Sequence, residues 1–234
     1  IGVKVVLVHG GGPEITDMLH KIGKETQFVD GLRVTDQETV EVAQMVLCGK
    51  INKSLVNLLQ CCGGKAIGLS GLDGHMIQAA QKDPRLGFVG EITKVDPQPV
   101  LDVLEAGYIP VVSTIGCDEA GHTYNINADT AAAKLAGALK AESFIALTDI
   151  SGLLRDKDDP STLISHITVK ETRELICQGV ISDGMIPKVE CCINAIEDGV
   201  SKVFIIDGRV PHSILIETLT DEGIGTMFQG EDLK

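Results

Sequence analysis

Residues 3–13, VKVVLVHGGGP, decide the fold class of this chain. Residues 3–8 form an almost continuous apolar run, which is typical of a β-strand buried on both faces. Three glycines follow, and Pro13 indicates the start of a helix, because proline is favoured at the first helical position. The stretch therefore predicts a strand, a glycine loop and a helix, the repeating unit of an α/β protein.

The alternation of strands and helices continues outward from this unit. We predict strands at residues 65–69, 109–113, 144–147 and 203–206, a β-hairpin around 88–95, and helices at 36–63, 97–107, 129–138, 168 onward and 185–196. This order predicts an open, mainly parallel central sheet sandwiched between helices. Ligands of such sheets bind beyond the carboxyl ends of the strands, which selects the loops at 10–12, 148–152 and 207–209.

Composition excludes several classes of protein. The chain has 234 residues, 44% of them apolar and only 3% aromatic, so its core must consist of aliphatic side chains. A net charge of −13 is opposite to that of a non-specific nucleic-acid binder. No apolar run reaches the roughly 20 residues of a membrane span. The seven cysteines, an odd number without metal-like spacing, predict reduced thiols that lie mostly in the core.

Two segments suggest an anion site. The glycine loop at residues 10–12 would expose backbone N–H groups at the positive end of a helix dipole, although a tight turn explains three glycines equally well. It matches neither a dinucleotide-binding fingerprint nor a P-loop. Arg33, before a helix capped by Asp36, offers a planar fork for a carboxylate. By itself, a surface arginine without such a role is the commoner explanation.

Two further segments add polar groups. Asn125, Asn127 and Asp129 alternate with small residues and would share one face of an extended stretch, while N-capping alone explains Asn127. Lys188 falls in the first turn of a helix, where a cation opposes the helix dipole unless it faces an anion. Together these groups describe a site suited to phosphoryl transfer, which needs positioning and positive charge more than covalent chemistry.

Six motifs resemble those of the acetylglutamate kinases, a family of the amino-acid kinase superfamily. They are VHGGGP (8–13), GLRVTD (31–36), YNINAD (124–129), LTDISG (147–152), GMIPKV (184–189) and IIDGR (205–209). Their order and spacing agree with that family over essentially the whole chain. The resemblance implies ATP-dependent phosphorylation of the side-chain carboxylate of N-acetyl-L-glutamate, a step of arginine biosynthesis.

The resemblance also implies roles for individual residues. Lys188 and Asp129 would be catalytic, one stabilising the transferring group and the other orienting the catalytic lysines. The acceptor site would comprise Gly11, Gly12, Arg33, Asn125 and Asn127. The nucleotide site would comprise Thr148, Asp149, Ile150, Ser151, Gly152, Leu153, Ile181 and Ser182. ATP would carry Mg²⁺ on its phosphates, with no metal site formed by the protein.

The same resemblance predicts the organisation and regulation of the enzyme. Residues 1–145 would bind acetylglutamate and dimerise, and residues 146–234 would bind ATP. Glu217 and Gly223 match the feedback site of arginine-inhibited members, which form hexamers through an N-terminal helix. A PII-type signalling protein is a further partner of some members. The location implied is the cytoplasm, or the plastid stroma in a plant or alga.

Two departures from the family pattern qualify these expectations. The family opens with a strand and a Lys-x-Gly-Gly loop that the chain lacks, so we expect an N-terminal segment to be missing and these 234 residues alone to be impaired. Ser182 and Asp183 replace a common Gly-Gly. Three alternatives stay open here: a related carbamate or glutamate kinase, a non-catalytic effector-binding protein of the same fold, and, last, an oxidoreductase.

Overall fold

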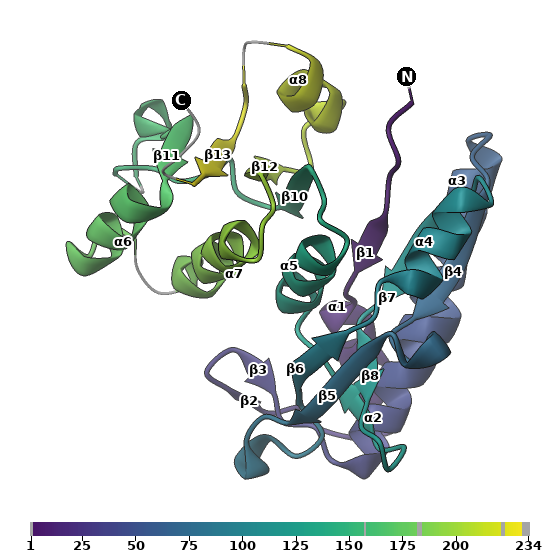
Figure 1. Ribbon diagram of the computed structural model, residues 1–234. Helices are drawn as coiled ribbons and strands as arrows, with labels where there is room; N and C mark the ends of the chain where they lie inside the picture. The colour runs from purple at the N-terminus through teal and green to yellow at the C-terminus, as the bar shows by residue number, and fades with distance from the viewer. Residues whose placement is uncertain (1, 157, 182–183, 221–222, 231–234) are drawn as a thin grey trace. The chain divides into compact units, whose positions relative to one another are not determined.

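The computed structural model describes residues 2–156, 158–181, 184–220 and 223–230. The chain forms two compact units, Ile1–Leu135 and Ala136–Lys234. Helix α5, Ala128–Ala138, carries the chain from the first unit into the second. Each unit is an α/β structure with its own sheet, as the ribbon diagram illustrates (Figure 1).

A parallel sheet forms the centre of the first unit. Its strand order is β1 (Leu7–His9), β7 (Ile109–Ser113) and β4 (Ala66–Ser70), all running parallel. Helices α3 (Asn52–Cys61) and α4 (Gln98–Glu105) pack against these strands (Figure 1). The burial of Val111 and Val112 in β7 is complete, as expected for the middle strand of a covered parallel sheet.

The first strand is shorter and more exposed than the sequence predicts. Only Leu7–His9 pair with β7, while Val3 and Val5 are 69% and 51% exposed. In the described part of the chain β1 is an edge strand, and its apolar residues 7–8 are only half-buried. The prediction of a strand over residues 3–8 buried on both faces is therefore wrong in length and burial.

The glycine loop leads directly into α1, Gly12–Lys21, with Pro13 in its first turn as predicted. Its inner face carries Ile15 and Leu19, which pack with Val46 and Leu47 in one apolar cluster. This packing fixes the helix at the end of β1. The first turn of α1 therefore lies at the carboxyl end of a parallel strand, where the sequence places an anion site.

A long helical run follows, as predicted for residues 36–63. It consists of α2 (Gln37–Gln44), a π-helical segment η1 (Met45–Ile51) and α3. The Asp36 carboxylate accepts the Thr39 N–H and caps α2. The apolar residues whose helical spacing predicts this run (Ile51, Leu55, Leu58, Leu59 and Cys62) are half-buried or exposed, Leu58 by 60%.

The first unit also contains antiparallel strands. A four-stranded sheet has the order β6 (Gly90–Val95), β5 (Ile77–Gln81), β8 (Ile115–Cys117) and β9 (Thr123–Asn125). The predicted hairpin near residues 88–95 is the β5–β6 pair, which begins earlier in the chain. Strands β2 (Phe28–Val29) and β3 (Leu32–Arg33) form a two-stranded ribbon.

The second unit has a mixed four-stranded sheet. Its order is β10 (Ser143–Thr148), β12 (Lys202–Asp207), β13 (Thr226–Gln229) and β11 (His166–Thr168). Strands β10 and β12 are parallel, whereas β12 and β13 are antiparallel. Its helices are α6 (Val169–Cys177), α7 (Met185–Glu197) and α8 (Ser213–Leu219). Short 3₁₀ turns lie at Asp73–His75, Pro84–Leu86 and Pro160–Thr162.

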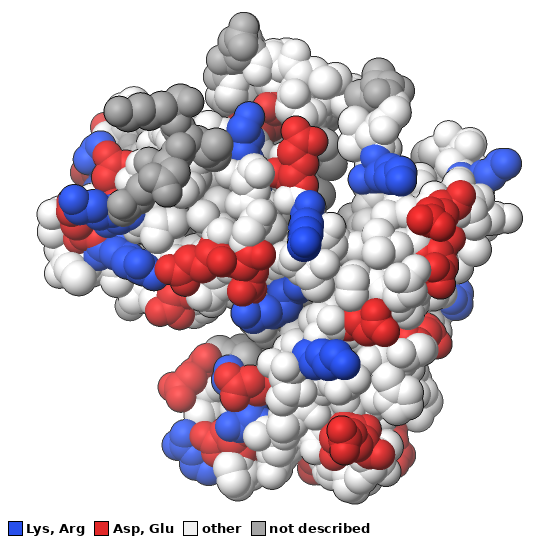
Figure 2. Space-filling view, viewed as in Figure 1, with Lys and Arg blue, Asp and Glu red and all other residues white. Residues whose placement is uncertain are grey.

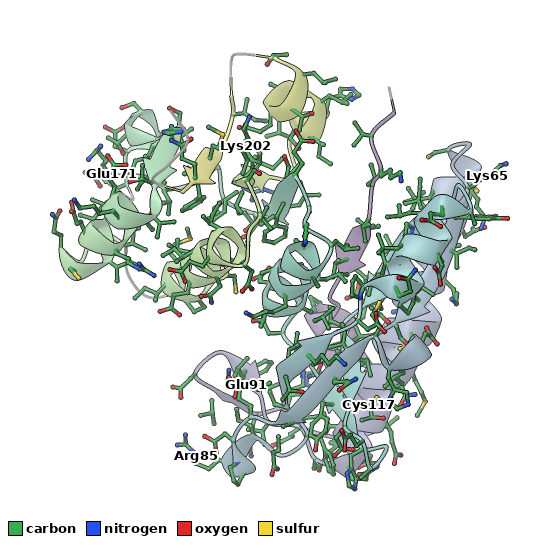
Figure 3. All side chains as sticks on the ribbon, in the orientation of Figure 1. Lys65, Arg85, Glu91, Cys117, Glu171 and Lys202 are labelled. Carbon is green, nitrogen blue, oxygen red and sulfur yellow. The ribbon has the colours of Figure 1, made fainter. Side chains whose placement is uncertain are left out.

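Two helices of the second unit follow their sequence signals closely. The spacing of Thr168 and Glu171 in the sequence predicts a capping box, and the two residues form one at the start of α6, where Figure 3 labels Glu171. In α7 the predicted inner face is buried at Val189, Cys192 and Ile193. These local signals suffice because a cap and one apolar stripe define a short amphipathic helix.

The exposure of the cysteines differs from the prediction. All seven cysteines are free thiols, but only Cys117 and Cys192 are buried, and Cys61, Cys62 and Cys177 are exposed. The prediction of mostly core thiols is therefore wrong.

Acidic and basic side chains mix over the face drawn in Figure 2. None of the helices in the described ranges has the length and apolar character that crossing a membrane requires.

Candidate active site

A pocket of about 210 Å³ opens in the first unit at the carboxyl end of β1. The glycine loop forms one wall, the β2–β3 ribbon a second, and the segment between β9 and α5 a third. Its lining comprises Gly10, Gly11, Gly12, Ile15, Phe28, Gly31, Leu32, Arg33, Leu47, Val89, Thr114, Asn125, Ile126, Asn127 and Ala128. All five residues that the sequence assigns to an acceptor site (Gly11, Gly12, Arg33, Asn125 and Asn127) lie in this one pocket.

The first two glycines of the loop are required by close packing. A Cβ at Gly10 would lie 2.9 Å from the Cβ of Ala128, and one at Gly11 would lie 2.1 Å from Cδ1 of Ile51. Backbone N–H groups at a helix N-terminus have no partner within the helix. Close packing therefore explains Gly10 and Gly11, and the position of the loop at the start of α1 is one that also suits an anion, so the anion site stays a prediction.

Arg33 is the cation of this pocket, and it is 93% buried, with only 7% of its surface exposed. Its Nη2 donates to the Gly12 carbonyl and to Thr16 Oγ1, both at 2.9 Å. Its Nη1 is buried and has no hydrogen-bond partner among the residues that the structure describes. Burial lowers the pKa of the guanidinium. A buried cationic nitrogen without an acceptor is costly, so an anionic group in this pocket would be stabilised by Arg33.

A tight hairpin, which the sequence-based prediction missed, holds Arg33 in place. Phe28 pairs across the ribbon with Arg33, and the Phe28 ring lies 4.8 Å from the guanidinium carbon. The turn residues Asp30 and Gly31 have φ of 51° and 77°, as a two-residue hairpin turn requires. An Asp-Gly pair between apolar residues is a sequence signal for such a turn. That signal would have identified Phe28 as the cation–π partner.

Of the segment 125–129, only some polar side chains are available to a ligand in the pocket. Asn127 Oδ1 accepts the Thr130 N–H at 3.0 Å, so this side chain caps α5, as its sequence position alone suggested. Asn125 is half-buried at the end of β9 and lines the pocket. Asp129 is half-buried in the first turn of α5 and is not among the pocket-lining residues. Of the three, Asn125 is the side chain that remains for a ligand.

An ion-pair cluster braces the segment after Arg33. Lys24 Nζ lies 2.7 Å from both Asp36 and Glu38. The hydrogen bonds from Lys24 and Thr39 lower the pKa of Asp36 to about 2. Because Asp36 caps α2 and Glu38 lies in its first turn, this cluster ties the segment after α1 to the start of α2, which follows Arg33 in the chain.

We expect Asp36→Asn to lower the free energy of unfolding by about 0.5 kcal/mol at pH 7, the usual size for an exposed pair. Asparagine retains the helix cap, so only the ion pair is lost. Since the pKa of Asp36 is depressed on folding, the difference should be present above the unfolded value near 3.8 and disappear as the pH falls to about 2. Denaturant titrations at several pH values, with the exposed Asp17→Asn as control, measure it. A difference that persists at pH 2 would contradict the assignment.

The second unit brings two predicted loops together at the ends of its parallel strands. Thr148 lies beside Asp207 in the strand register, and the Gly208 N–H donates to the Thr148 carbonyl at 2.8 Å. Arg209 forms a two-pronged ion pair with Asp207, which lowers the pKa of that carboxyl. Asp149 contributes a further carboxylate near Arg209. The two loops that the strand-end rule selects in this unit are therefore neighbours.

The rest of the predicted nucleotide segment continues from this edge. Gly152 passes so close to Thr226 that a Cβ would lie 2.6 Å from its Oγ1, and that hydroxyl accepts the Leu153 N–H at 2.8 Å. The segment at Ile150 and Ser151 connects these two points. Ile181 is buried after α6. Ser182, and with it Asp183, lies outside the described residues.

The remaining predicted residues also fall in the second unit. Lys188 is half-buried in the first turn of α7, as predicted. Glu217, on α8, accepts the N–H groups of Ile224 and Gly225 at 2.7 and 3.0 Å and so holds the loop that contains Gly223. In the described part of the chain, no group of three His, Cys, Asp or Glu side chains could hold a metal ion.

The fold and pocket agree with the comparisons to known proteins. The family model for the amino acid kinase family matches residues 1–207, so the chain belongs to that family. Among the curated proteins, the acetylglutamate kinase of Brachyspira hyodysenteriae is 58% identical over 97% of this chain and 80% of its own length. That of Moorella thermoacetica is 54% identical with the same coverage. Within the family, the chain therefore belongs with the acetylglutamate kinases.

A solved structure supports the fold independently. The protein smu.665 from Streptococcus mutans UA159 is 29% identical and superposes with a TM-score of 0.81. The alignment covers 97% of this chain and 86% of that protein. The family and its α/β fold are thus confirmed, and a dinucleotide-dependent oxidoreductase is excluded.

Proposed function

We propose that the chain transfers the terminal phosphoryl group of ATP to the side-chain carboxylate of N-acetyl-L-glutamate, giving N-acetylglutamyl phosphate for arginine biosynthesis. The observation that carries this proposal is the buried Arg33, whose Nη1 lacks a hydrogen-bond partner in the described structure. A carboxylate oxygen of the substrate would accept a hydrogen bond from Nη1, while Nη2 keeps its bonds to Gly12 and Thr16. Acetylglutamate has two carboxylates, so one is held by Arg33 while the other faces the glycine loop.

The glycine loop and Arg33 bind different ends of the substrate. The N–H groups of Gly11 and Gly12 stabilise the carboxylate oxygens and the transferring phosphoryl group, and Asn125 binds the acetamido end. Lys188 neutralises charge that develops in the transition state, and Asp129 orients the catalytic lysines. Residues 1–145 form the acceptor lobe and residues 146–234 the nucleotide lobe. ATP enters with Mg²⁺, which stays on the phosphates because it retains much of its hydration.

A substrate panel tests the proposed reaction in the full-length natural protein. ADP release should require N-acetyl-L-glutamate and should be negligible with carbamate or free glutamate, since carbamate has a single carboxylate and the α-nitrogen of glutamate is a charged ammonium instead of a neutral amide. A hydroxamate trap should capture the acyl phosphate. Turnover with carbamate or glutamate and none with acetylglutamate would overturn the proposal. Nucleotide binding without any turnover would favour a non-catalytic effector-binding protein.

We further propose that L-arginine inhibits the enzyme at α8 and the loop after it. Glu217 is a carboxylate whose Oε2 is already used by the Ile224 and Gly225 N–H groups, and its Oε1 lies 3.8 Å from a Cβ position at Gly223. A guanidinium or ammonium group would be attracted to this carboxylate.

Glu217→Gln tests the arginine site, because it keeps an oxygen for the loop but removes the charge. We expect the arginine concentration for half inhibition to rise by about tenfold or more, the loss of one charge-assisted contact. The kcat without arginine should stay unchanged. Glu190→Gln, an exposed carboxylate on α7, is the control. Equal arginine sensitivity in both variants would refute the site.

We also propose a homodimer in the cytoplasm, where ATP is available. Met45 and Leu58, on η1 and α3, are 64% and 60% exposed, and an apolar surface of this kind suits contact with a second copy. Light scattering coupled to size exclusion measures the mass, and a monomer at micromolar concentration would contradict the dimer.

A further inference from the structure

His9, the residue before the glycine loop, sits in a buried network that the proposed chemistry does not use. It ends β1, and only 9% of its surface is exposed. Its Nε2 lies 3.2 Å from the side-chain nitrogen of Asn52, and its Nδ1 lies 3.0 Å from the Gly10 carbonyl. The ring therefore links the first residue of α3 to the first residue of the glycine loop.

The contacts of Asn52 assign the tautomer of His9. The Asn52 side-chain nitrogen also lies 2.8 Å from the Val111 carbonyl and 3.2 Å from the Leu69 carbonyl, so it must be the donor end of the amide. An amide nitrogen cannot accept a proton from the ring, so Nε2 of His9 is the acceptor, and it shares the two amide protons of Asn52 with the two carbonyls. The ring proton then resides on Nδ1 and is donated to the Gly10 carbonyl. Burial lowers the pKa of His9, which favours this neutral ring.

The bond to the Gly10 carbonyl affects the next residue. In a planar trans peptide the C=O of one residue and the N–H of the next point in opposite directions. Holding the Gly10 carbonyl against the His9 ring therefore directs the Gly11 N–H away from it. Gly10 and Gly11 both line the pocket. A glycine peptide without such a restraint rotates easily, because it has no Cβ.

We propose that His9 is a positioning residue, which in its Nδ1–H tautomer, held by Asn52, fixes the Gly10–Gly11 peptide so that the Gly11 N–H is aimed at the reacting group. This inference rests on the proposed function and specifies how its glycine donors are preorganised. Lys53 supports the network from the other end of the amide, since its Nζ lies 3.2 Å from Asn52 Oδ1. An N–H aimed in advance stabilises developing charge without reorganisation.

Two substitutions separate positioning from packing. In His9→Asn the amide nitrogen replaces Nδ1, so the bond to the Gly10 carbonyl is kept and the bond to Asn52 is lost. In His9→Gln the longer amide replaces Nε2, so the bond to Asn52 is kept and the bond to Gly10 is lost. Both remove the ring, so they share the loss of packing. The measurements are kcat, the KM for each substrate and the melting temperature in the full-length protein.

The expected results run in opposite directions. His9→Asn should retain kcat within about threefold, although it melts at a lower temperature than the wild type. His9→Gln should lose about tenfold in kcat, although its melting temperature stays closer to that of the wild type. The loss is only about tenfold because the Gly11 N–H is misdirected and not removed. The KM for ATP should not change in either. Loss of kcat that follows melting temperature, with His9→Asn the worse variant, would overturn the proposal.

A spectroscopic measurement does not depend on the folding of either variant. The imidazole ¹⁵N shifts of His9 in the wild-type protein should report a neutral ring protonated at Nδ1, and a ring protonated at Nε2 would equally refute the proposal. Wild-type turnover of acetylglutamate tests the proposed function separately. If it is absent, the function fails, whereas the tautomer can still be measured.

Discussion

Replacing Arg33 with methionine is expected to weaken binding of N-acetyl-L-glutamate by about one to two orders of magnitude, the loss of a charge-assisted hydrogen bond from Nη1. Methionine fills a similar volume and retains contact with the Phe28 ring. Calorimetric titration of the 234-residue chain measures this directly, because the pocket lies wholly within the first unit. Lysine should rescue little, since it lacks the planar fork.

The same substitution should leave folding almost unchanged. Methionine removes a buried nitrogen that has no acceptor in the described structure, and Thr16 keeps its own bond to the Gly12 carbonyl. Arg85→Met is the matched control, because Arg85 is exposed and pairs with Asp83 away from the pocket-lining residues. Affinity that falls equally in both variants, or not in either, would contradict the assignment of Arg33 to the acceptor carboxylate.

Asn52→Asp is expected to lower the free energy of unfolding by about 3 to 5 kcal/mol at neutral pH. The change is nearly isosteric, but it sets a carboxylate against the carbonyls of Leu69 and Val111 and against Nε2 of His9. These three acceptors come from three different strands. The expected result is therefore loss of the first unit's cooperative unfolding transition in denaturant.

The control and the pH dependence make this prediction specific. Asn57→Asp, an exposed position on the same helix, should cost little. The acceptors around position 52 would raise the pKa of the introduced carboxyl above its unfolded value near 3.9. Its destabilisation is thus complete above the raised pKa and fades as the pH falls toward 3.9. A deficit that is independent of pH would indicate a packing defect instead.

The sequence predicts the acceptor site better than it predicts burial. Local chemistry singles out the glycine loop, Arg33 and Asn125 as candidates, the family resemblance predicts a common role for them, and the fold brings them into one pocket. The β2–β3 ribbon was missed although Asp30 and Gly31 signal it. The ribbon matters because it places Phe28 opposite Arg33.

The burial of a side chain is not predicted from the sequence where it depends on residues that are distant in the chain. Spacing identifies an apolar stripe on residues 51–62 but not the surface that would cover it, and Leu58 stays 60% exposed. The π-helical turn at Met45–Ile51 precedes Asn52, so that α3 buries this polar residue. Nothing in helical spacing predicts that a helix will bury an asparagine. Its three acceptors on β1, β4 and β7 explain it only once the sheet is formed.

The close approach of Gly10 to Ala128 has a consequence for how the first unit holds together. These residues stand near opposite ends of that unit's sequence, so the acceptor pocket exists only after almost the whole unit has folded. A ligand that binds only the folded form stabilises it by about 2.7 kcal/mol at a hundredfold excess over its Kd. Bound substrate thus raises the free energy of unfolding of the first unit, and in a cell depleted of substrate the enzyme would unfold more readily.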